Sequence, residues 1–197
     1  MSEQPPRIPP IPMPEFRRLM VDSFGVDVGD DSATLNITRT WAHHPELMVA
    51  QRPLQNYLMR TSKKLPARER ELAILRIGWR CGSEYEFGQH TIFGKRAGLT
   101  DEEIRRVTSG PTDPGWSEFE VVLLTAVDEL YEQHRISDET WLRLGDRYDA
   151  AALIEFVSLV GRYWTVSVLL NTVGVALEPG TPGFPSAESL PDGHLDR

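Results

Sequence analysis

The sequence contains one cysteine, Cys81, among its 197 residues. A single cysteine cannot close an intrachain disulfide, and no set of cysteines and histidines has the spacing of a zinc site. The phosphate-binding, dinucleotide-binding, zinc-protease and nucleophile-elbow motifs are also missing. We therefore expect no metal and no cofactor.

Cationic residues are few. Lysine and arginine number 21 against 29 aspartate and glutamate, which gives a formal net charge of -8. A nucleic-acid-binding surface requires clustered positive charge, and so does electrostatic attachment to anionic membranes. The composition therefore argues against a nucleic-acid partner and against a membrane partner.

Long hydrophobic runs and a cationic-then-apolar leader are also absent. The longest apolar helical candidate, 153–170, is interrupted by Glu155, Gly161 and Arg162. A bilayer-spanning helix needs about 20 consecutive apolar residues. We expect a cytoplasmic protein without a membrane-spanning segment.

Alternation of polar and apolar residues over strand lengths is nowhere convincing, whereas spacings of three and four recur throughout. The pattern predicts an all-α protein with helices over 45–59, 66–80, 84–97, 101–108, 116–131, 141–148 and 150–170. Ser83 with Glu86, and Thr100 with Glu103, each fit a capping box that would start a helix. Pro53 is expected to bend or break the first of these helices.

The two ends are rich in proline. Six prolines lie within residues 1–14, and prolines and glycines recur over 179–197. We expect an N-terminal arm over 1–15, one helical domain over 16–178 and an irregular tail over 179–197. Each arm either stays solvated or clasps a neighbouring subunit. The apolar helix near 157–170 leads us to expect a homo-oligomer of two, three or six chains.

Glu86 and His90 are the leading candidates for chemistry. Residues four apart share one face of a helix, and a carboxylate beside an imidazole can move a proton near neutral pH. The start of a helix, flanked here by Gly82 and Gly88, also favours a bound anion. The alternative is a surface ion pair in which Glu86 only caps its helix.

Three further positions have two interpretations each. Cys81 is either a nucleophile or a small buried filler. Glu71, in an apolar helix, is either paired with an arginine (Arg68, Arg70, Arg76 or Arg80) or a solvated first-turn acid. The adjacent His43 and His44 suggest a metal only weakly, and packing at a helix start is favoured.

The ordered run over 68–104, with Glu71, Cys81-Gly82-Ser83-Glu84-Tyr85-Glu86 and His90, resembles the carboxymuconolactone decarboxylase family and its AhpD-like alkylhydroperoxidases. The resemblance implies an AhpD-like all-α bundle that forms oligomers. The peroxidase branch carries a glutamate, eleven residues and then Cys-x-x-Cys-x-x-x-His. Ser83 and Glu86 stand at the two thiol positions, so a dithiol mechanism has no dithiol here.

The Glu-Tyr-Glu-x-x-x-His form instead is similar to the cofactor-free decarboxylase branch, which implies action on a small carboxylated lactone or related keto-acid. In that interpretation His90, Glu86 and Glu71 are catalytic, and His90, oriented by Glu86, delivers a proton to the carbanion left by CO₂. Arg80 or Arg76, oriented by Glu71, binds the anionic substrate.

Tyr85, Ser83 and Cys81 complete the expected substrate-binding set. Two other functions stay open. One is a redox protein in which Cys81 works with an external thiol, and the other is a non-catalytic oligomer that has kept the fold.

Overall fold

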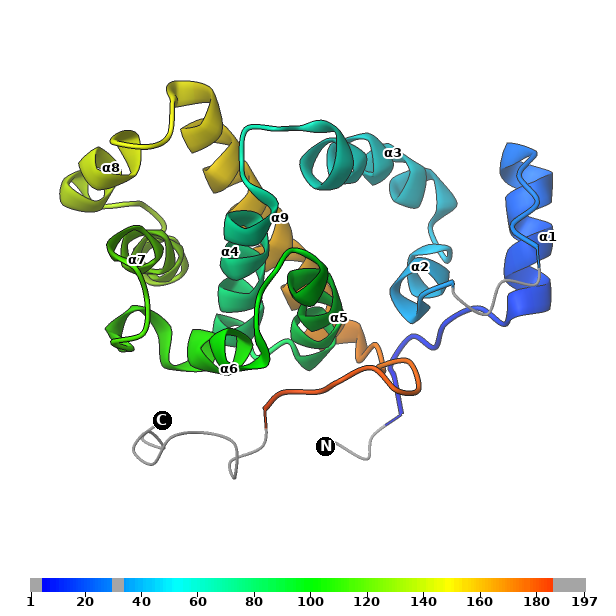
Figure 1. Cartoon of the computed structure of the whole chain (residues 1–197). Coiled ribbons are helices and arrows are strands. Elements are labelled where there is room, and N and C mark those ends of the chain that lie inside the picture. The colour runs from blue at the N-terminus through cyan, green and yellow to red at the C-terminus, as the bar shows by residue number, and fades with distance from the viewer. Residues whose placement is uncertain (1–4, 30–33, 186–197) are drawn as a thin grey trace. The chain divides into compact units, whose positions relative to one another are not determined.

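The computed structural model describes residues 5–29 and 34–185, and within these ranges every regular element is helical (Figure 1). The all-α prediction is confirmed. The elements are α1 (Met13–Phe24), α2 (Asn36–Trp41), α3 (Pro45–Asn56), a π-helical turn η1 (Tyr57–Thr61), α4 (Ala67–Arg80), α5 (Glu84–Arg96), α6 (Asp101–Ser109), a 3₁₀ turn η2 (Gly110–Thr112), α7 (Glu118–Gln133), α8 (Asp138–Gly145) and α9 (Ala150–Val173).

The chain divides into two compact units. One takes in Met1–Ser62 and Leu169–Gly180, and the other takes in Lys63–Val168 and the segment from Thr181 onward. The single domain expected over 16–178 stays a prediction, as do the arms predicted on either side of it. Most of the predicted tail, 186–197, lies outside the described residues.

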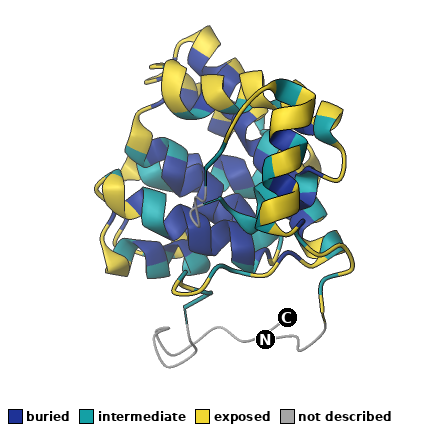
Figure 2. Cartoon of the chain, turned by 90° about the vertical axis from the view of Figure 1, so that its right-hand side faces the viewer, coloured by how far each residue is buried: buried dark blue, intermediate teal, exposed yellow. Residues whose placement is uncertain are grey.

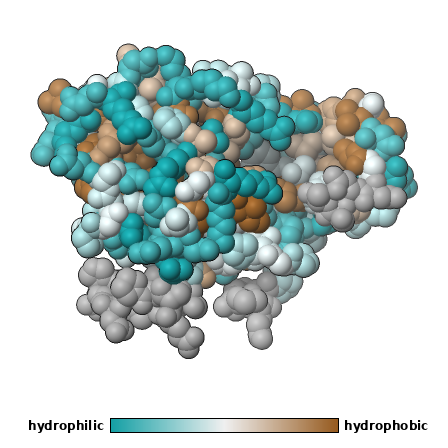
Figure 3. Space-filling view, viewed as in Figure 1, coloured by the Kyte–Doolittle hydropathy of each residue, from teal (hydrophilic) through white to brown (hydrophobic). Residues whose placement is uncertain are grey.

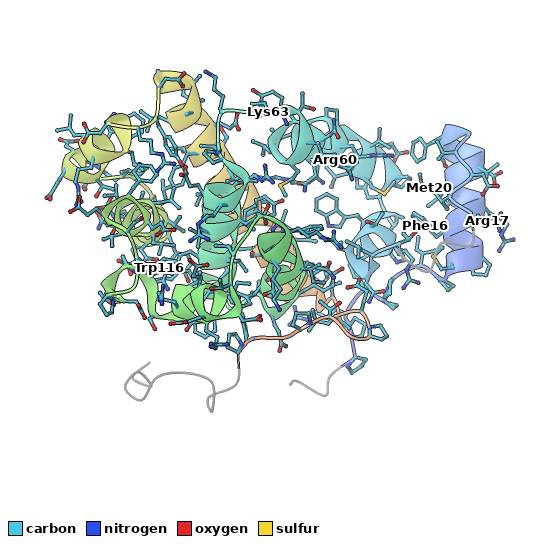
Figure 4. All side chains as sticks on the ribbon, in the orientation of Figure 1. Phe16, Arg17, Met20, Arg60, Lys63 and Trp116 are labelled. Atoms are coloured by element: carbon cyan, nitrogen blue, oxygen red, sulfur yellow. The ribbon has the colours of Figure 1, made fainter. Side chains whose placement is uncertain are left out.

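In the first unit, α1 buries one side against residues that precede and follow it. Phe16 and Met20, labelled in Figure 4, lie one turn apart and pack in a cluster with Ile11, Ala42 and Met48. The described part of the N-terminal segment is bonded to this unit, since the Arg7 amide donates to the Val173 carbonyl at 2.8 Å. Pro53 lies inside α3 without ending it, and the π-helical η1 begins four residues later, at Tyr57.

The second unit is built around α4. Its residues from Leu72 to Ile77 are almost wholly buried, because apolar side chains cover most of the circumference of this helix. Figure 2 shows buried residues in dark blue toward the interior of the chain and exposed ones in yellow at its outside. Helices α5, α6 and α7 pack against it. Hydrophilic residues cover much of the face seen in Figure 3, with apolar patches between them.

Helix starts in this unit follow local sequence signals in most cases. Thr100 and Ser117 form complete capping boxes with Glu103 and Glu120, and Ser137 caps α8 through the Thr140 amide. The predicted capping box at Ser83 is wrong. Ser83 does precede the first residue of α5, but its side chain makes no capping bond. Glu86 is instead bonded to His90.

Helix α9 corrects another expectation. Over its 24 residues it is long and apolar enough to cross a membrane by length and composition, although none was expected to be. Half of its apolar window is buried within the chain, and core helices of soluble proteins pass the same test. Glu155 and Arg162 do not lower the mean hydropathy of α9 enough to make it too polar for a membrane-spanning helix.

The segment that follows Gly180 returns to α4 and α5. The ring of Phe184 lies edge-on to Trp79 at 4.9 Å and to Phe87 at 5.3 Å between centroids. The Phe184 amide also points to a carboxylate oxygen of Glu84 at 3.4 Å. This part of the C-terminal tail therefore packs on its own chain, against the N-terminal end of α5.

Candidate active site

Two helices bring three titratable side chains together. Glu71 projects from α4, and Glu86 and His90 project from the first two turns of α5. Gly78 lies two turns after Glu71 on the same face of α4, where an added Cβ would lie only 3.5 Å from the Glu86 side chain and the Phe87 amide. Gly78 therefore marks the place where α4 and α5 pack closely beside the three groups.

The imidazole of His90 lies between two carboxylates. Its Nδ1 is 2.6 Å from Oε2 of Glu71, and its Nε2 is 3.0 Å from Oε1 of Glu86. The exposed fractions are 1% for Glu71, 4% for Glu86 and 4% for His90. The surface-pair alternative for Glu86 and His90 is therefore wrong.

Glu71 has one more partner, Arg70. The Arg70 guanidinium lies 3.2 Å from Oε1 of Glu71, on the carboxylate oxygen that His90 does not use. Of the four arginines considered for Glu71, Arg70 is the one that binds it. The result is a continuous line of Arg70, Glu71, His90 and Glu86, in which positive and negative groups alternate.

Aromatic rings close the site around the imidazole. Tyr163 of α9 meets the His90 ring edge-on at 4.9 Å, and Phe93 of α5 meets it at 5.3 Å. Such walls exclude water and strengthen the electrostatic interactions among the enclosed groups.

The surroundings of His90 shift its protonation. Burial disfavours the charged ring, but the hydrogen bonds and the negative charges of Glu71 and Glu86 outweigh that cost. Together they raise the pKa of His90 to about 9. The ring therefore carries two N–H groups at neutral pH and donates both, one to each carboxylate.

Arg162 is a functional candidate that the sequence-based reasoning did not include. It is half-buried on α9, next to Tyr163. Burial lowers the pKa of its guanidinium, and the charge of Glu86 acts in the opposite direction. The only signal in the sequence was a charged residue inside an apolar helix, which the sequence analysis interpreted as an interruption.

The structure places Arg76 and Arg80 on another side of α4. At 100° per residue, Arg76 and Arg80 point about 140° and 180° away from Glu71. Arg76 binds both carboxylate oxygens of Asp128 at 2.7 Å, and Arg80 binds Glu132 at 2.5 Å. Glu71 therefore orients neither of them, and both point to α7.

The remaining expected residues lie at the junction of α4 and α5. Tyr85 is buried, and Ser83 is completely enclosed, with no hydrogen-bond partner for its hydroxyl in the part of the chain that the structure describes. Cys81 is partly buried, and burial raises the pKa of its thiol to about 11, although a hydrogen bond with Ser167 and the charge of Arg80 act against this. The thiol is thus protonated at neutral pH.

No three His, Cys, Asp or Glu side chains within 5–29 and 34–185 are arranged to hold a metal ion. The cluster at His90 supplies a proton and two carboxylates, with arginines on its flanks. Such a set can transfer a proton to or from a carbon atom and can balance the charge of a small anion.

One family of known proteins matches the part of the chain that contains the site. The model of the carboxymuconolactone decarboxylase family matches residues 45–129, which include Glu71, Glu86 and His90. No curated protein matches the sequence.

Several solved structures share the fold. The AhpD core of a peroxidase-related protein from Ralstonia eutropha JMP134 aligns at a TM-score of 0.71 with 15% identity, over 89% of this chain and 94% of the other. A protein from Agrobacterium tumefaciens, related by its description to the antioxidant defence protein AhpD, aligns at 0.65 with 19% identity, over 70% and 94%.

A third structure is a cysteine-to-alanine variant of the debrominase Bmp8 in complex with 2,3,4-tribromopyrrole. It aligns at 0.66 with 17% identity, over 87% of this chain and 91% of that one. At these identities the likeness shows the fold alone. The family model matches the part of the chain that holds the site, and the solved structures share its fold, so over residues 45–129 the chain is similar to the carboxymuconolactone decarboxylase family and its AhpD-like relatives.

Proposed function

We propose that this protein is a cofactor-free enzyme of carbon-acid chemistry, a decarboxylase acting on a small carboxylated lactone or a related keto-acid. The observation that carries the proposal is a charged imidazole held between two buried carboxylates. A group of this kind delivers a proton where water is scarce, which is the demand that loss of CO₂ makes.

In the reaction, the bond from the substrate carbon to its carboxylate breaks, and CO₂ leaves without the electron pair. The pair stays on the carbon and spreads into the neighbouring carbonyl as an enolate. A proton then forms the new C–H bond. No oxidant or reductant is needed.

The proton path differs from the one expected from the sequence. Both nitrogens of His90 are bonded to carboxylates, so the ring does not face substrate directly. We assign the contact with the reacting carbon to Glu86, which receives a proton from Nε2 of His90 and passes it on. Glu71, held by Arg70, keeps the ring oriented and stabilises its charge.

The substrate anion needs a cation near Glu86. Arg162 meets this need better than Arg76 or Arg80, because its helix also supplies Tyr163 to the wall of the site. The hydroxyl of Ser83 adds a buried donor, and Tyr85 and Cys81 stay in the proposed binding set on the same junction. The Bmp8 complex contains a small ring compound in this fold, which is in keeping with a small cyclic substrate.

The redox alternative has less support. It would use the Cys81 thiol, yet burial keeps that thiol protonated, and Ser83 and Glu86 occupy the positions of a peroxidase dithiol. Alkylation of Cys81 separates the two functions, since loss of peroxide turnover on alkylation would favour the thiol mechanism. A non-catalytic protein is the third function, and it predicts that no small carboxylated lactone or keto-acid is turned over.

The test is a screen of small carboxylated lactones and keto-acids with the purified full chain, following CO₂ release and deuterium uptake from D₂O. With a substrate in hand, Glu86→Gln and His90→Gln should lower kcat by about 10²- to 10⁴-fold. Glu132→Gln, which removes an exposed carboxylate bound to Arg80, is the matched control and should retain activity.

Wild-type turnover from folded Glu86→Gln or His90→Gln would remove the proposed proton path. Circular dichroism and thermal unfolding of each variant show whether it is folded.

Arg162→Lys should raise KM more than it lowers kcat, because it keeps the charge but not the bidentate geometry of the guanidinium.

A further inference from the structure

Two serine hydroxyls are enclosed where α5 begins. Ser83 is the residue before the first turn of α5, and Ser167 lies on the buried face of α9; both are 0% exposed. Neither hydroxyl has a hydrogen-bond partner of normal geometry among the described residues. A buried hydroxyl without such a partner costs free energy, so each of the two needs an explanation.

Other serines of the chain show what Ser83 does not do. Ser117 and Ser137 also precede helices, and each hydroxyl accepts a bond from an amide of the first turn at 3.3 Å. Ser83 accepts no such bond from the start of α5. Its hydroxyl is therefore not used to stabilise the helix that it precedes.

Ser167 differs in a similar way from other hydroxyls within helices. Thr91, Ser158 and Thr165 each donate to the carbonyl four residues earlier, at 2.9, 2.8 and 3.0 Å in that order. The Ser167 hydroxyl makes no such bond and instead lies beside the thiol of Cys81, which is a weak partner. It is therefore turned from its own helix toward the turn between α4 and α5.

The contacts of α9 place Ser167 next to the start of α5. Tyr163 meets the ring of His90, which lies in the second turn of α5. Ser167 lies one turn further along α9 and meets Cys81, which comes just before α5. Helix α9 therefore runs antiparallel to α5 here, and its buried face passes from the imidazole to the helix start.

Ser83 is held on the side of α4 that faces Glu86. The Ser83 amide donates to the Gly78 carbonyl at 2.9 Å, and Gly78 is where α4 packs closely against the Glu86 side chain. The residue before a helix and the third residue of that helix also lie within reach of each other. The two hydroxyls therefore border the place where Glu86 would meet a substrate carbon.

We propose that Ser83 and Ser167 bind the carbonyl oxygen of the substrate that becomes the enolate oxygen. The inference rests on the proposed decarboxylation. As the bond to CO₂ breaks, its electron pair moves onto the carbon and into the carbonyl, whose oxygen takes up the negative charge. The two hydroxyls donate hydrogen bonds to this oxygen and keep their protons, and the proton from Glu86 goes to the carbon.

The start of α5 favours the same charge. The first amides of a helix have no partner inside the helix and carry partial positive charge, and Ser83 does not cap them. Donors placed around an oxygen whose charge grows during the reaction stabilise the transition state more than the bound substrate. The substrate class is thus an acid whose carboxylate is attached to a carbon next to a ketone or lactone carbonyl.

Unfolding of the free protein provides a test that needs no substrate. Ser83→Ala and Ser167→Ala remove hydroxyls that the fold does not use, so each variant should unfold at the wild-type temperature or above it. Ser117→Ala and Ser137→Ala are the matched controls, and loss of the capping bond should lower their unfolding temperature by about 2–4 °C. An equal drop in Ser83→Ala or Ser167→Ala would assign that hydroxyl to the fold and overturn the proposal.

An enolate mimic tests the ligand. Tetronic acid is a five-membered lactone whose enol is ionised at neutral pH, so it presents a charged oxygen like that of the intermediate. Isothermal titration calorimetry of the full chain should show binding, and Ser83→Ala and Ser167→Ala should each weaken it about 10- to 100-fold. Ser158→Ala, which removes a hydroxyl bonded within α9, should bind tetronate as the wild type does.

The neutral lactone γ-butyrolactone is the control for charge, and its affinity should be affected much less by the two substitutions. A wild type that does not bind tetronate, or serine variants that bind it as tightly as the wild type, would overturn the proposal. Failure of the proposed function has a different result: tetronate would bind through the two serines, but no carboxylated lactone or keto-acid would be turned over.

With a substrate in hand, Ser83→Ala and Ser167→Ala should lower kcat about 10²-fold and change KM less, because the charge on the oxygen develops in the transition state. An effect confined to KM would mean that the serines bind the substrate before the reaction only, and would overturn their assignment to the enolate oxygen.

Discussion

Two buried carboxylates lie two residues apart on α4 and lead to different chemistry. Glu69 accepts a hydrogen bond from the Tyr148 hydroxyl at 2.5 Å and also binds Arg147. Glu71 accepts one from His90 at 2.6 Å and binds Arg70. Residues two apart in a helix are rotated by about 200° about its axis, so Glu69 and Glu71 point to opposite sides of α4.

The partner decides what each carboxylate can do. Burial, with the hydrogen bond and charge of Glu69, raises the pKa of Tyr148, so that its phenol keeps its proton throughout the neutral range. The pKa of His90 is raised only to about 9, which leaves a proton that can be given up and regained. The cluster at Glu69 therefore holds the fold, whereas the cluster at Glu71 can also take part in proton transfer.

The largest effect should come from removing the cation between two carboxylates. His90→Ala leaves Glu71 and Glu86 buried and facing each other, and we expect the free energy of unfolding to fall by about 3–5 kcal/mol. Urea unfolding followed by circular dichroism measures it.

Removing the two negative charges should restore part of the stability that His90→Ala loses. Adding Glu71→Gln and Glu86→Gln to His90→Ala should recover part of the lost stability, because neutral amides need no cation. A triple variant that is less stable than His90→Ala would show that cavity formation, not charge, dominates the loss.

The next effect is a pH dependence. The folded pKa of His90, about 9, exceeds the ordinary value of 6.5, so folding favours the charged ring. Its contribution of up to about 3 kcal/mol is complete below pH 6.5 and is lost as the pH rises to about 9. Unfolding free energies at pH 6.5, 8 and 9.5 measure the decline.

Glu71→Gln is the control for this decline. This variant removes one of the two carboxylates that stabilise the charged ring of His90, so the pKa of His90 should be raised less. The free energy of unfolding should then decline over a narrower pH range and at lower pH. The cluster at Glu69 behaves differently, since stability from the raised pKa of Tyr148 is lost only above about pH 10. A wild type whose stability is flat from pH 6.5 to 9.5 would contradict the pKa of His90.

Local patterns in the sequence were enough to predict part of this site. The interval between Glu86 and His90 predicted their contact, because residues four apart share a helix face. The capping box of Thr100 with Glu103 also predicted a helix start that the structure confirms. These features depend on neighbours within one turn of helix.

Features that depend on which helix faces meet could not be predicted in this way. Glu71 and His90 are 19 residues apart, and their contact needs α5 to lie on the Gly78 side of α4. The periodicity of α4 alone could have excluded Arg76 and Arg80 as partners of Glu71. It could not have indicated that Tyr163 of α9 closes the site.

A smaller effect is expected at the Glu69 cluster. Tyr148→Phe removes the hydroxyl but leaves Arg147 to balance the charge, so we expect a loss of about 1–2 kcal/mol in the free energy of unfolding. Turnover of a confirmed substrate should not change. A kcat that fell as far as that of His90→Gln would show instead that the Glu69 cluster is coupled to the Glu71 cluster.

The smallest effects compare the two arginines. The Arg70 side chain is mostly buried on a fully buried carboxylate, whereas that of Arg147 is half exposed. We expect Arg70→Gln to cost about 1–2 kcal/mol of unfolding free energy, because Glu71 loses a desolvated partner. Arg147→Gln should cost less than about 1 kcal/mol, since water already screens that pair.

Thermal and urea unfolding of both variants in low and high salt measures the difference. Salt should weaken the wild-type contribution of Arg147 more than that of Arg70, and the reverse order would mean that burial does not set the strength of these pairs.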